Sequence, residues 1–289
     1  MRKLVVTIAV LAGLLVAADF GTAAAAEYQI AKQLRSEFDL TRDPSVRING
    51  FPFLTQALSG SYREITMQAT GLPVGSLTDV AVEATMYDVE APLDELMSGS
   101  LSTVQIDEVE GRVQIKDTDV GRAIGIEDLR ISRPSEDEIR KVIGPEELDG
   151  ARENAESSGS EGYSGSEGSN GSDDSDGSDE DTRAPVRLAA TTDLVGEDIE
   201  VILIGTLELE GGVVRVEPTD VRLAKDDVDE FSLPSSFGDP IIDVFTRTID
   251  PGELPFTVTP ESVDVETGVL IVEGTADDVS FSQAGLGSQ

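Results

Sequence analysis

The sequence contains no cysteine, no histidine and no tryptophan in its 289 residues. It therefore cannot form a Ser-His-Asp or Cys-His catalytic site, a disulfide, a thiolate metal site or a His-ligated zinc or haem site. Paired carboxylates could still hydrolyse glycosides, but aromatic residues make up only 4% of the chain and offer no platform for a sugar. We expect no catalytic residue, no cofactor and no metal site, and hence a protein that is not an enzyme.

Basic residues are also scarce. There are 21 Lys and Arg against 57 Asp and Glu, which gives a formal net charge of -36. This balance argues against nucleic acid as a partner, because phosphate binding needs Lys and Arg surfaces. Residues 157–182 hold eight of the carboxylates, so most of the acidic excess lies elsewhere in the chain. The acidity fits either solubility in a salty medium or ordinary drift in a secreted protein.

Residues 1–26 have the order of an export segment. Arg2 and Lys3 precede the apolar run Leu4–Ala18, and the small-residue tract Thr22–Ala26 follows; this order is typical of a signal peptide. The apolar run is shorter than the ~20 residues of a spanning helix, and a longer span would bury Asp19. A cleaved signal peptide and a retained membrane anchor both stay open. Either one places the rest of the chain outside the cytoplasm, secreted or anchored in the cell envelope.

Hydrophobic periodicity predicts an α+β fold dominated by antiparallel sheet. Apolar residues recur at helical spacing from Glu27 to Phe38, and Asp239-Pro240 begins a second amphipathic helix that ends at Asp250-Pro251. Other segments alternate as strands do. The further predictions are a half-buried strand at Val80–Met86, hairpins that turn at Glu110-Gly111, Gly211-Gly212 and Thr267-Gly268, and a short helix from Thr118 or Asp119 to about Leu129.

Residues 157–182 interrupt this pattern. Apart from Asn170 and Thr182 they consist of Ser, Gly, Asp and Glu, with Tyr163 as the single aromatic residue. This is too little apolar surface to offset the entropy of ordering. An EF-hand loop is not formed, because aligning Gly177 as its glycine puts Ser172 and Arg183 at the first and last ligand positions. The sequence therefore predicts four parts: an export segment at 1–26, the first half of a domain at 27–156, a disordered acidic linker at 157–182 and the second half of the domain at 183–289.

The most distinctive segment is Asn49–Gln56, in which two Phe bracket a Pro directly after a Gly turn. Because proline fixes the backbone, this is a rigid kink that directs bulky apolar groups to one side. With Pro44, Val46 and Ile48 before it, the segment resembles the opening of the LmeA-like family of actinobacterial envelope proteins. Two further blocks are similar to that family: Val89-x-Ala91-Pro92-Leu93 with Leu96, and Leu254-Pro255-Phe256-x-Val258 with Val263, Val265, Gly268, Val269 and Gly274.

This resemblance covers most of residues 27–130 and 186–282. Members of the family are exported, bind phospholipids including phosphoinositides, and in one type support mannan elongation of lipoglycans. The resemblance implies a non-catalytic phospholipid-binding or lipid-transfer protein of the cell envelope that works at the membrane surface. It also implies a tubular-lipid-binding-like fold, in which a curved antiparallel sheet wraps around amphipathic helices. The acidic linker is an insertion relative to the family.

The implied fold holds acyl chains between a helix and the concave face of the sheet. On this basis the expected lipid-binding side chains are Leu34, Phe38, Phe51, Phe53, Leu54, Ile241 and Phe245. The expected headgroup residues are Lys32, Arg35 and Arg47, because residues 28–65 are the one region with a slight positive balance. The alternative function is that of an envelope structural or assembly protein without a lipid pocket.

Overall fold

The computed structural model describes residues 2–37, 40–98, 104–126, 128–142, 182–194, 197–210, 213–225, 228–232 and 259–281. The helices are α1 (Arg2–Glu37), α2 (Phe53–Ser59), α3 (Leu93–Ser98), α4 (Asp117–Ile124) and α5 (Glu136–Val142). The strands are β1 (Ser45–Asn49), β2 (Ser61–Val74), β3 (Leu77–Glu90), β4 (Val104–Lys116), β5 (Arg130–Ser132), β6 (Arg183–Leu194), β7 (Glu197–Glu210), β8 (Val213–Lys225), β9 (Val228–Ser232), β10 (Thr259–Glu266) and β11 (Val269–Phe281). The acidic linker and the helix predicted from Asp239 lie outside the described residues.

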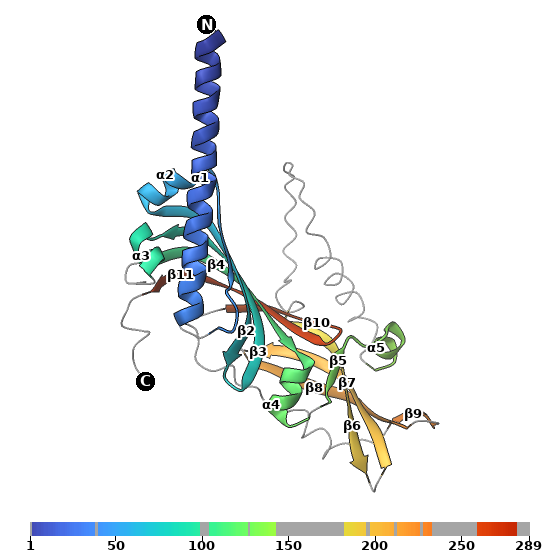
Figure 1. Cartoon of the computed structure of the whole chain (residues 1–289). Coiled ribbons are helices and arrows are strands. Elements are labelled where there is room, and N and C mark those ends of the chain that lie inside the picture. Colours follow the sequence, from blue (N-terminus) through green and yellow to red (C-terminus); the bar gives the residue numbers. More distant parts are fainter. Residues whose placement is uncertain are drawn as a thin grey trace, which may run out of the picture.

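The strands form two antiparallel sheets. A six-stranded sheet has the order β1-β2-β3-β4-β11-β10, and a five-stranded sheet has the order β5-β6-β7-β8-β9. Strand β11 pairs with β4 along its whole length, so the C-terminal hairpin completes a sheet that the N-terminal part of the chain begins. The α+β class with antiparallel sheet is thus confirmed. Figure 1 shows α1 along one end of the six-stranded sheet, with the N-terminal half of the helix extending beyond the rest of the protein.

Three local predictions are confirmed and one is wrong. Strands β7 and β8 pair as a hairpin, with Glu210 opposite Val213 on either side of Gly211-Gly212. The half-buried strand at Val80–Met86 lies within β3, and β10 and β11 form the closing hairpin around Thr267-Gly268. The hairpin predicted at Glu110-Gly111 does not exist, because both residues lie in the middle of the single strand β4. Glycine there is not a turn signal: Gly111 pairs with Ala84 on one side and with Gly274 on the other. The short helix predicted to Leu129 ends earlier, at Ile124.

Two hydrophobic cores cover the two ends of one face of the six-stranded sheet. In the first, which we call the α1 core, Ala26, Ile30 and Ala31 of α1 pack against β1, β2, β3, β4 and β11. In the second, the α4 core, Val120 and Ile124 of α4 pack together with β10, β11 and the five-stranded sheet. The α4 core therefore joins the two sheets. In the α1 core, α1 packs against strands of the six-stranded sheet.

Helix α4 is fixed to the sheet by the buried Asp119. Its carboxylate accepts hydrogen bonds from the backbone N–H of Thr78 at 2.7 Å, the hydroxyl of Thr78 at 2.8 Å and the backbone N–H of Asp79 at 3.1 Å, and it pairs with Arg122. Burial alone would raise the pKa of Asp119, but these hydrogen bonds and the Arg122 charge outweigh it and lower the pKa. The carboxylate is therefore ionised and holds the end of the sheet against α4.

Candidate functional site

One face of the six-stranded sheet is apolar between the two cores. Two rows of residues, each in register across four strands, make up this part, and we call them the middle rows. The middle rows are Met67, Ala84, Gly111 and Gly274, and next to them Ala69, Val82, Val113 and Val272. No polar side chain interrupts either row, which is unusual for a surface that a soluble protein leaves to water.

The middle rows connect the cores without a break. On one side the next row, Ile65, Met86, Val109 and Ala276, packs in or against the α1 core. On the other side Ile115 and Leu270 pack in or against the α4 core. The opposite face of the same strands carries charged and polar residues, as expected for a sheet with one solvated face. An apolar path therefore runs along the sheet from α1 to α4.

Six of the eight residues of the middle rows are less buried than the cores on either side, whereas Ala69 and Gly274 are buried. Met67, Val82, Ala84 and Val113 remain half-buried, whereas the core residues of both clusters are less than 10% exposed. Small residues also lower this part of the face. Among the described residues, a Cβ atom built at Gly111 would have one neighbour within 4 Å, the Gly274 carbonyl oxygen at 3.7 Å. The sheet thus presents a depressed apolar strip with room for additional carbon atoms above Gly111.

The alternation of side chains changes where the apolar path enters the α1 core. Asp88 of β3 and Asp278 of β11 have positive φ angles, 48° and 51°, a conformation that Asp adopts more readily than most residues. Both lie at the same level of the sheet, since Val89 and Val279 each pair with Ile106. A left-handed residue changes the side to which the following side chains point. Apolar residues before and after this level therefore all reach the α1 core.

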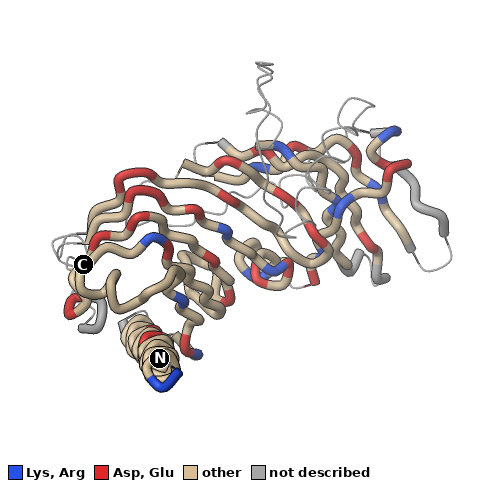
Figure 2. Tube along the Cα trace, turned by 90° about the horizontal axis from the view of Figure 1, so that it is seen from above, with Lys and Arg blue, Asp and Glu red and all other residues tan. Residues whose placement is uncertain are grey.

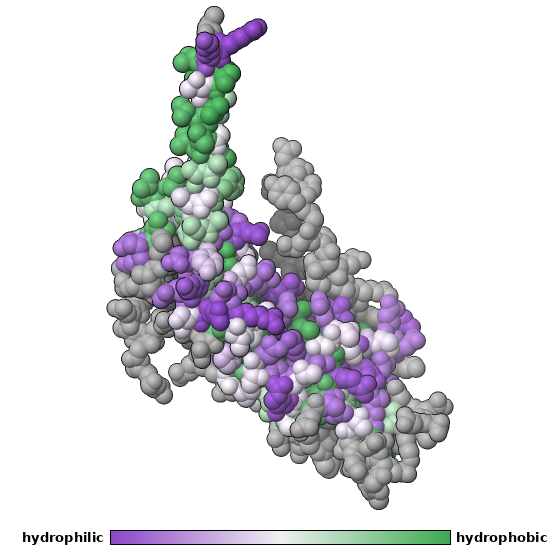
Figure 3. Space-filling view, viewed as in Figure 1, coloured by the Kyte–Doolittle hydropathy of each residue, from purple (hydrophilic) through white to green (hydrophobic). Residues whose placement is uncertain are grey.

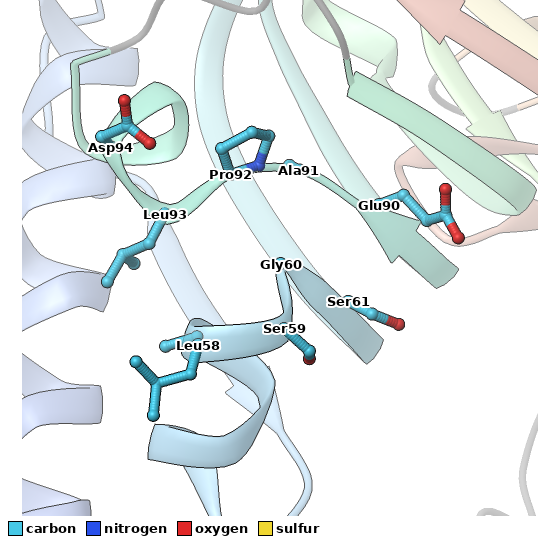
Figure 4. A pocket seen from close by; sticks show the side chains of 10 residues that line it. Leu58, Ser59, Gly60, Ser61, Glu90, Ala91, Pro92, Leu93 and Asp94 are labelled. Atoms are coloured by element: carbon cyan, nitrogen blue, oxygen red, sulfur yellow. The ribbon is translucent and has the colours of Figure 1, made fainter.

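Two cavities lie at the ends of the path. The one inside the α4 core is apolar, lies between α4 and the five-stranded sheet, and has a volume of about 50 Å³, which is room for one or two water-sized molecules. The other, of about 540 Å³, is open and lies where α2 meets β2 and β3 meets α3, as Figure 4 shows. Glu90 and Asp94 belong to its lining, and none of the ten described lining residues is Lys or Arg. This cavity is unsuited to a phosphate.

The expected lipid-binding residues do not form one wall. Phe53 is buried in the α1 core and Leu34 packs against that core. Phe51 and Leu54 instead lie at the start of α2 and are 58% and 37% exposed. Phe38, Ile241 and Phe245 lie outside the described residues, so four of the seven can be placed and only Phe51 and Leu54 share an exposed surface.

The expected headgroup residues lie on the surface near the α1 core. Lys32 and Arg47 are exposed, while Arg35 forms an ion pair with Asp43 at 3.1 Å. Figure 2 shows that acidic residues recur along the strands of both sheets, with fewer basic residues between them. Lys32 and Arg47 are therefore accessible positive charges in a strongly acidic protein, as are Arg42 and Arg63 nearby in the sequence.

The sequence analysis did not predict the middle rows and identified only two of their residues as part of a strand. The alternation at Val80–Met86 identified Val82 and Ala84 as members of a half-buried strand. It could not show which residues of other strands lie beside them, because β11 joins β4 from the far end of the chain. Gly111 was predicted to be a turn residue. Only the pairing of β4 with β11 shows that it lies inside the sheet, opposite Gly274.

Comparison with known proteins agrees with the earlier resemblance. The LmeA-like phospholipid-binding family matches residues 17–275, which is most of the chain and includes both sheets. A search of curated proteins and a search of solved structures gave no match. The protein belongs to the LmeA-like phospholipid-binding family.

Proposed function

We propose that this protein is a non-catalytic, extracytoplasmic phospholipid carrier. In this proposal the acyl chains of the bound lipid lie along the middle rows. The observation that supports this most strongly is the unbroken apolar path between the α1 core and the α4 core. The surface of this path is lowest at Gly111 and Gly274, which have no side chain. A lipid chain is a long apolar ligand, and this path is a long apolar surface of matching chemistry. The membership of a phospholipid-binding family supports the same choice of ligand.

Apolar contact supplies the attraction in this proposal. Each buried methylene contributes about 0.8 kcal/mol, so eight methylenes laid along the sheet would contribute about 6 kcal/mol before the costs of binding. No charged side chain has to be desolvated, because all eight members of the middle rows are apolar. The binding of the chain would then depend on its length and not on the identity of the headgroup.

An anionic headgroup needs basic residues as partners, in a protein of net charge -36. Lys32 on α1 and Arg47 on β1 are exposed and lie at the end of the sheet that α1 covers. We propose that a phosphate contacts Lys32 while the chains extend toward α4, because the side chain of Arg47 lies on the polar face of the sheet, in the row of Thr66 and Thr85. Phosphoinositides would fit this arrangement, and so would other anionic phospholipids. A role in supplying or positioning lipid for mannan elongation is the part of the proposal that rests on the family resemblance.

The proposal predicts that lipid accompanies the purified protein. After gentle extraction and purification, organic extracts of the protein should contain phospholipid at close to one molecule per chain, as measured by mass spectrometry against an internal standard. A structural or assembly protein without a lipid site would give extracts no richer in phospholipid than those of an unrelated membrane-associated protein purified in parallel. That second result would contradict the proposal.

A further inference from the structure

Helix α1 passes without a break through the tract where a signal peptidase would cut. The helix spans 36 residues, Arg2–Glu37, and includes the small-residue tract Thr22–Ala26. Ala26, the last residue of that tract, is 4% exposed and belongs to the α1 core. Cleavage after Ala26 would therefore remove part of the hydrophobic core, which is not a property of a disposable signal peptide.

Asp19 makes a second connection between this segment and the folded domain. Asp19 is 4% exposed. Its two carboxylate oxygens accept hydrogen bonds from the backbone N–H groups of Phe53 and Leu54 at 2.9 and 2.8 Å. These N–H groups open α2, whose own capping residue, Pro52, provides no side-chain hydrogen bond. Asp19 thus caps the N-terminus of α2 from another helix, which stabilises the contact between α1 and α2.

Two contacts of α1 residues that follow Asp19 strengthen the connection. The rings of Phe20 and Phe51 stack with their centroids 6.0 Å apart and an angle of 22° between their planes. Directly after the small-residue tract, the carboxylate of Glu27 accepts the backbone N–H of Ile48 in β1 at 2.8 Å. The contacts of the segment with the domain therefore begin well before the expected cleavage point and continue past it.

We propose that residues 1–26 are not removed, and that α1 holds the protein in the membrane with α2 lying in the outer interfacial layer beside it. This inference rests on the extracytoplasmic location in the proposed function and is independent of the lipid site. By length and composition α1 could cross a membrane. It is apolar and almost wholly exposed from Leu4 to Ala18, and Figure 3 shows this hydrophobic surface standing clear of the domain.

The length of the apolar helix places α2 at the membrane surface. Leu4–Ala18 spans about 22 Å at 1.5 Å per residue, less than the ~30 Å of a hydrocarbon core. The span reaches about 30 Å if it continues to Ala23, which leaves Ala26, buried in the α1 core, outside the hydrocarbon. Asp19 opposes such a span in the sequence because a carboxylate is costly in lipid. In the structure its carboxylate accepts two backbone N–H groups of α2, which lowers this cost.

Helix α2 has the side chains that the interfacial position requires. Phe51, Leu54 and Leu58 are 58%, 37% and 88% exposed, and α2 packs directly against α1. Large exposed apolar residues beside an apolar helix that leaves the domain favour a lipid bilayer over a protein partner, since the two surfaces are continuous. The membrane would cover all three residues together with the N-terminal half of α1.

The first test is the N-terminus of the mature protein. We expect the full chain, expressed from its own start in an actinobacterial host, to be recovered from membranes washed with alkaline carbonate, with an intact mass that includes residues 2–26. A mature N-terminus near Glu27 would overturn the proposal. Lipid in the same preparation is measured separately, so a cleaved protein that still holds lipid would refute the anchor and leave the lipid site standing.

The second test places α2 in the bilayer. Because the chain has no Trp, Leu58→Trp introduces a single fluorophore, and Glu266→Trp, at the exposed turn between β10 and β11, is the matched control. In vesicles of phosphatidylcholine and phosphatidylglycerol with brominated acyl chains, we expect at least half of the Leu58→Trp fluorescence to be quenched and the Glu266→Trp fluorescence to be unchanged. Equal quenching of both variants, or of neither, would overturn the proposed position of α2.

Discussion

Replacement of Gly111 by isoleucine is expected to weaken phospholipid binding on the order of 100-fold and to leave the protein folded. The new side chain would fill the open space above Gly111, where the nearest atom to its Cβ is the Gly274 carbonyl oxygen at 3.7 Å. Displacing about four methylenes of an acyl chain at about 0.8 kcal/mol each costs about 3 kcal/mol, which corresponds to that loss of affinity. Titration of the delipidated protein with a fluorescent phospholipid measures the effect.

The position allows this change without a folding penalty. Gly111 lies inside a strand, where glycine is unfavourable and a β-branched residue is favourable, and its φ is not in the left-handed region. The melting temperature of Gly111→Ile should therefore equal or exceed that of the parent. Gln114→Leu, an apolar substitution on the opposite face of β4, is the control and should bind lipid normally. If Gly111→Ile also binds normally, the acyl chain does not lie on the middle rows.

The largest expected loss of stability is that of Asp119→Ala. The substitution leaves the N–H groups of Thr78 and Asp79 and the Thr78 hydroxyl without the acceptor that they have in the structure. Unpaired buried donors cost about 1–3 kcal/mol each, and partial solvation in the variant should hold the total near 3 kcal/mol. Chemical denaturation at pH 7 measures this loss. Arg122→Ala should cost less than about 1 kcal/mol, because the Arg122 side chain is 60% exposed.

The effect of Asp119 is also expected to depend on pH. Its pKa is lower in the folded protein than in the unfolded chain, so it contributes stability above its unfolded pKa of about 3.9. This contribution is lost as the pH falls through the still lower folded pKa. The difference in unfolding free energy between the parent and Asp119→Ala should therefore be full at pH 7 and become smaller below about pH 4. A difference that grows in acid would contradict this description of the carboxylate.

The sequence could predict local secondary structure better than it could predict which distant strands pair with one another. Alternating apolar residues indicated β3 and the closing hairpin because a half-buried strand needs that period regardless of its partners. The pairing of β4 with β11 depends on a contact between distant parts of the chain, and no local signal marks it. Gly111 shows the consequence: as a local feature it is a turn residue, and in its sheet it is the lowest point of the apolar strip.

Charged residues show the same limit. Asp19 counted in the sequence as an obstacle to a membrane-spanning helix, because a carboxylate has no partner in lipid. The structure gives it two backbone partners in α2, which lie more than thirty positions further along the chain. Asp88 and Asp278 were two acidic residues among many, yet their positive φ angles bring apolar residues on both sides of them into one core. The chemistry of these side chains was visible, and their geometry was not.

The location of the acyl chain is tested most directly by photo-crosslinking. The full chain would be loaded with a phospholipid that carries a diazirine in the middle of one acyl chain, irradiated, and digested for tandem mass spectrometry. We expect the labelled residues to lie on the apolar face of the six-stranded sheet, at or beside Met67, Val82, Ala84 and Val113, and to disappear in Gly111→Ile. Labelling confined to the polar face of these strands or to the surface of α2, unchanged in Gly111→Ile, would contradict a lipid site on the middle rows.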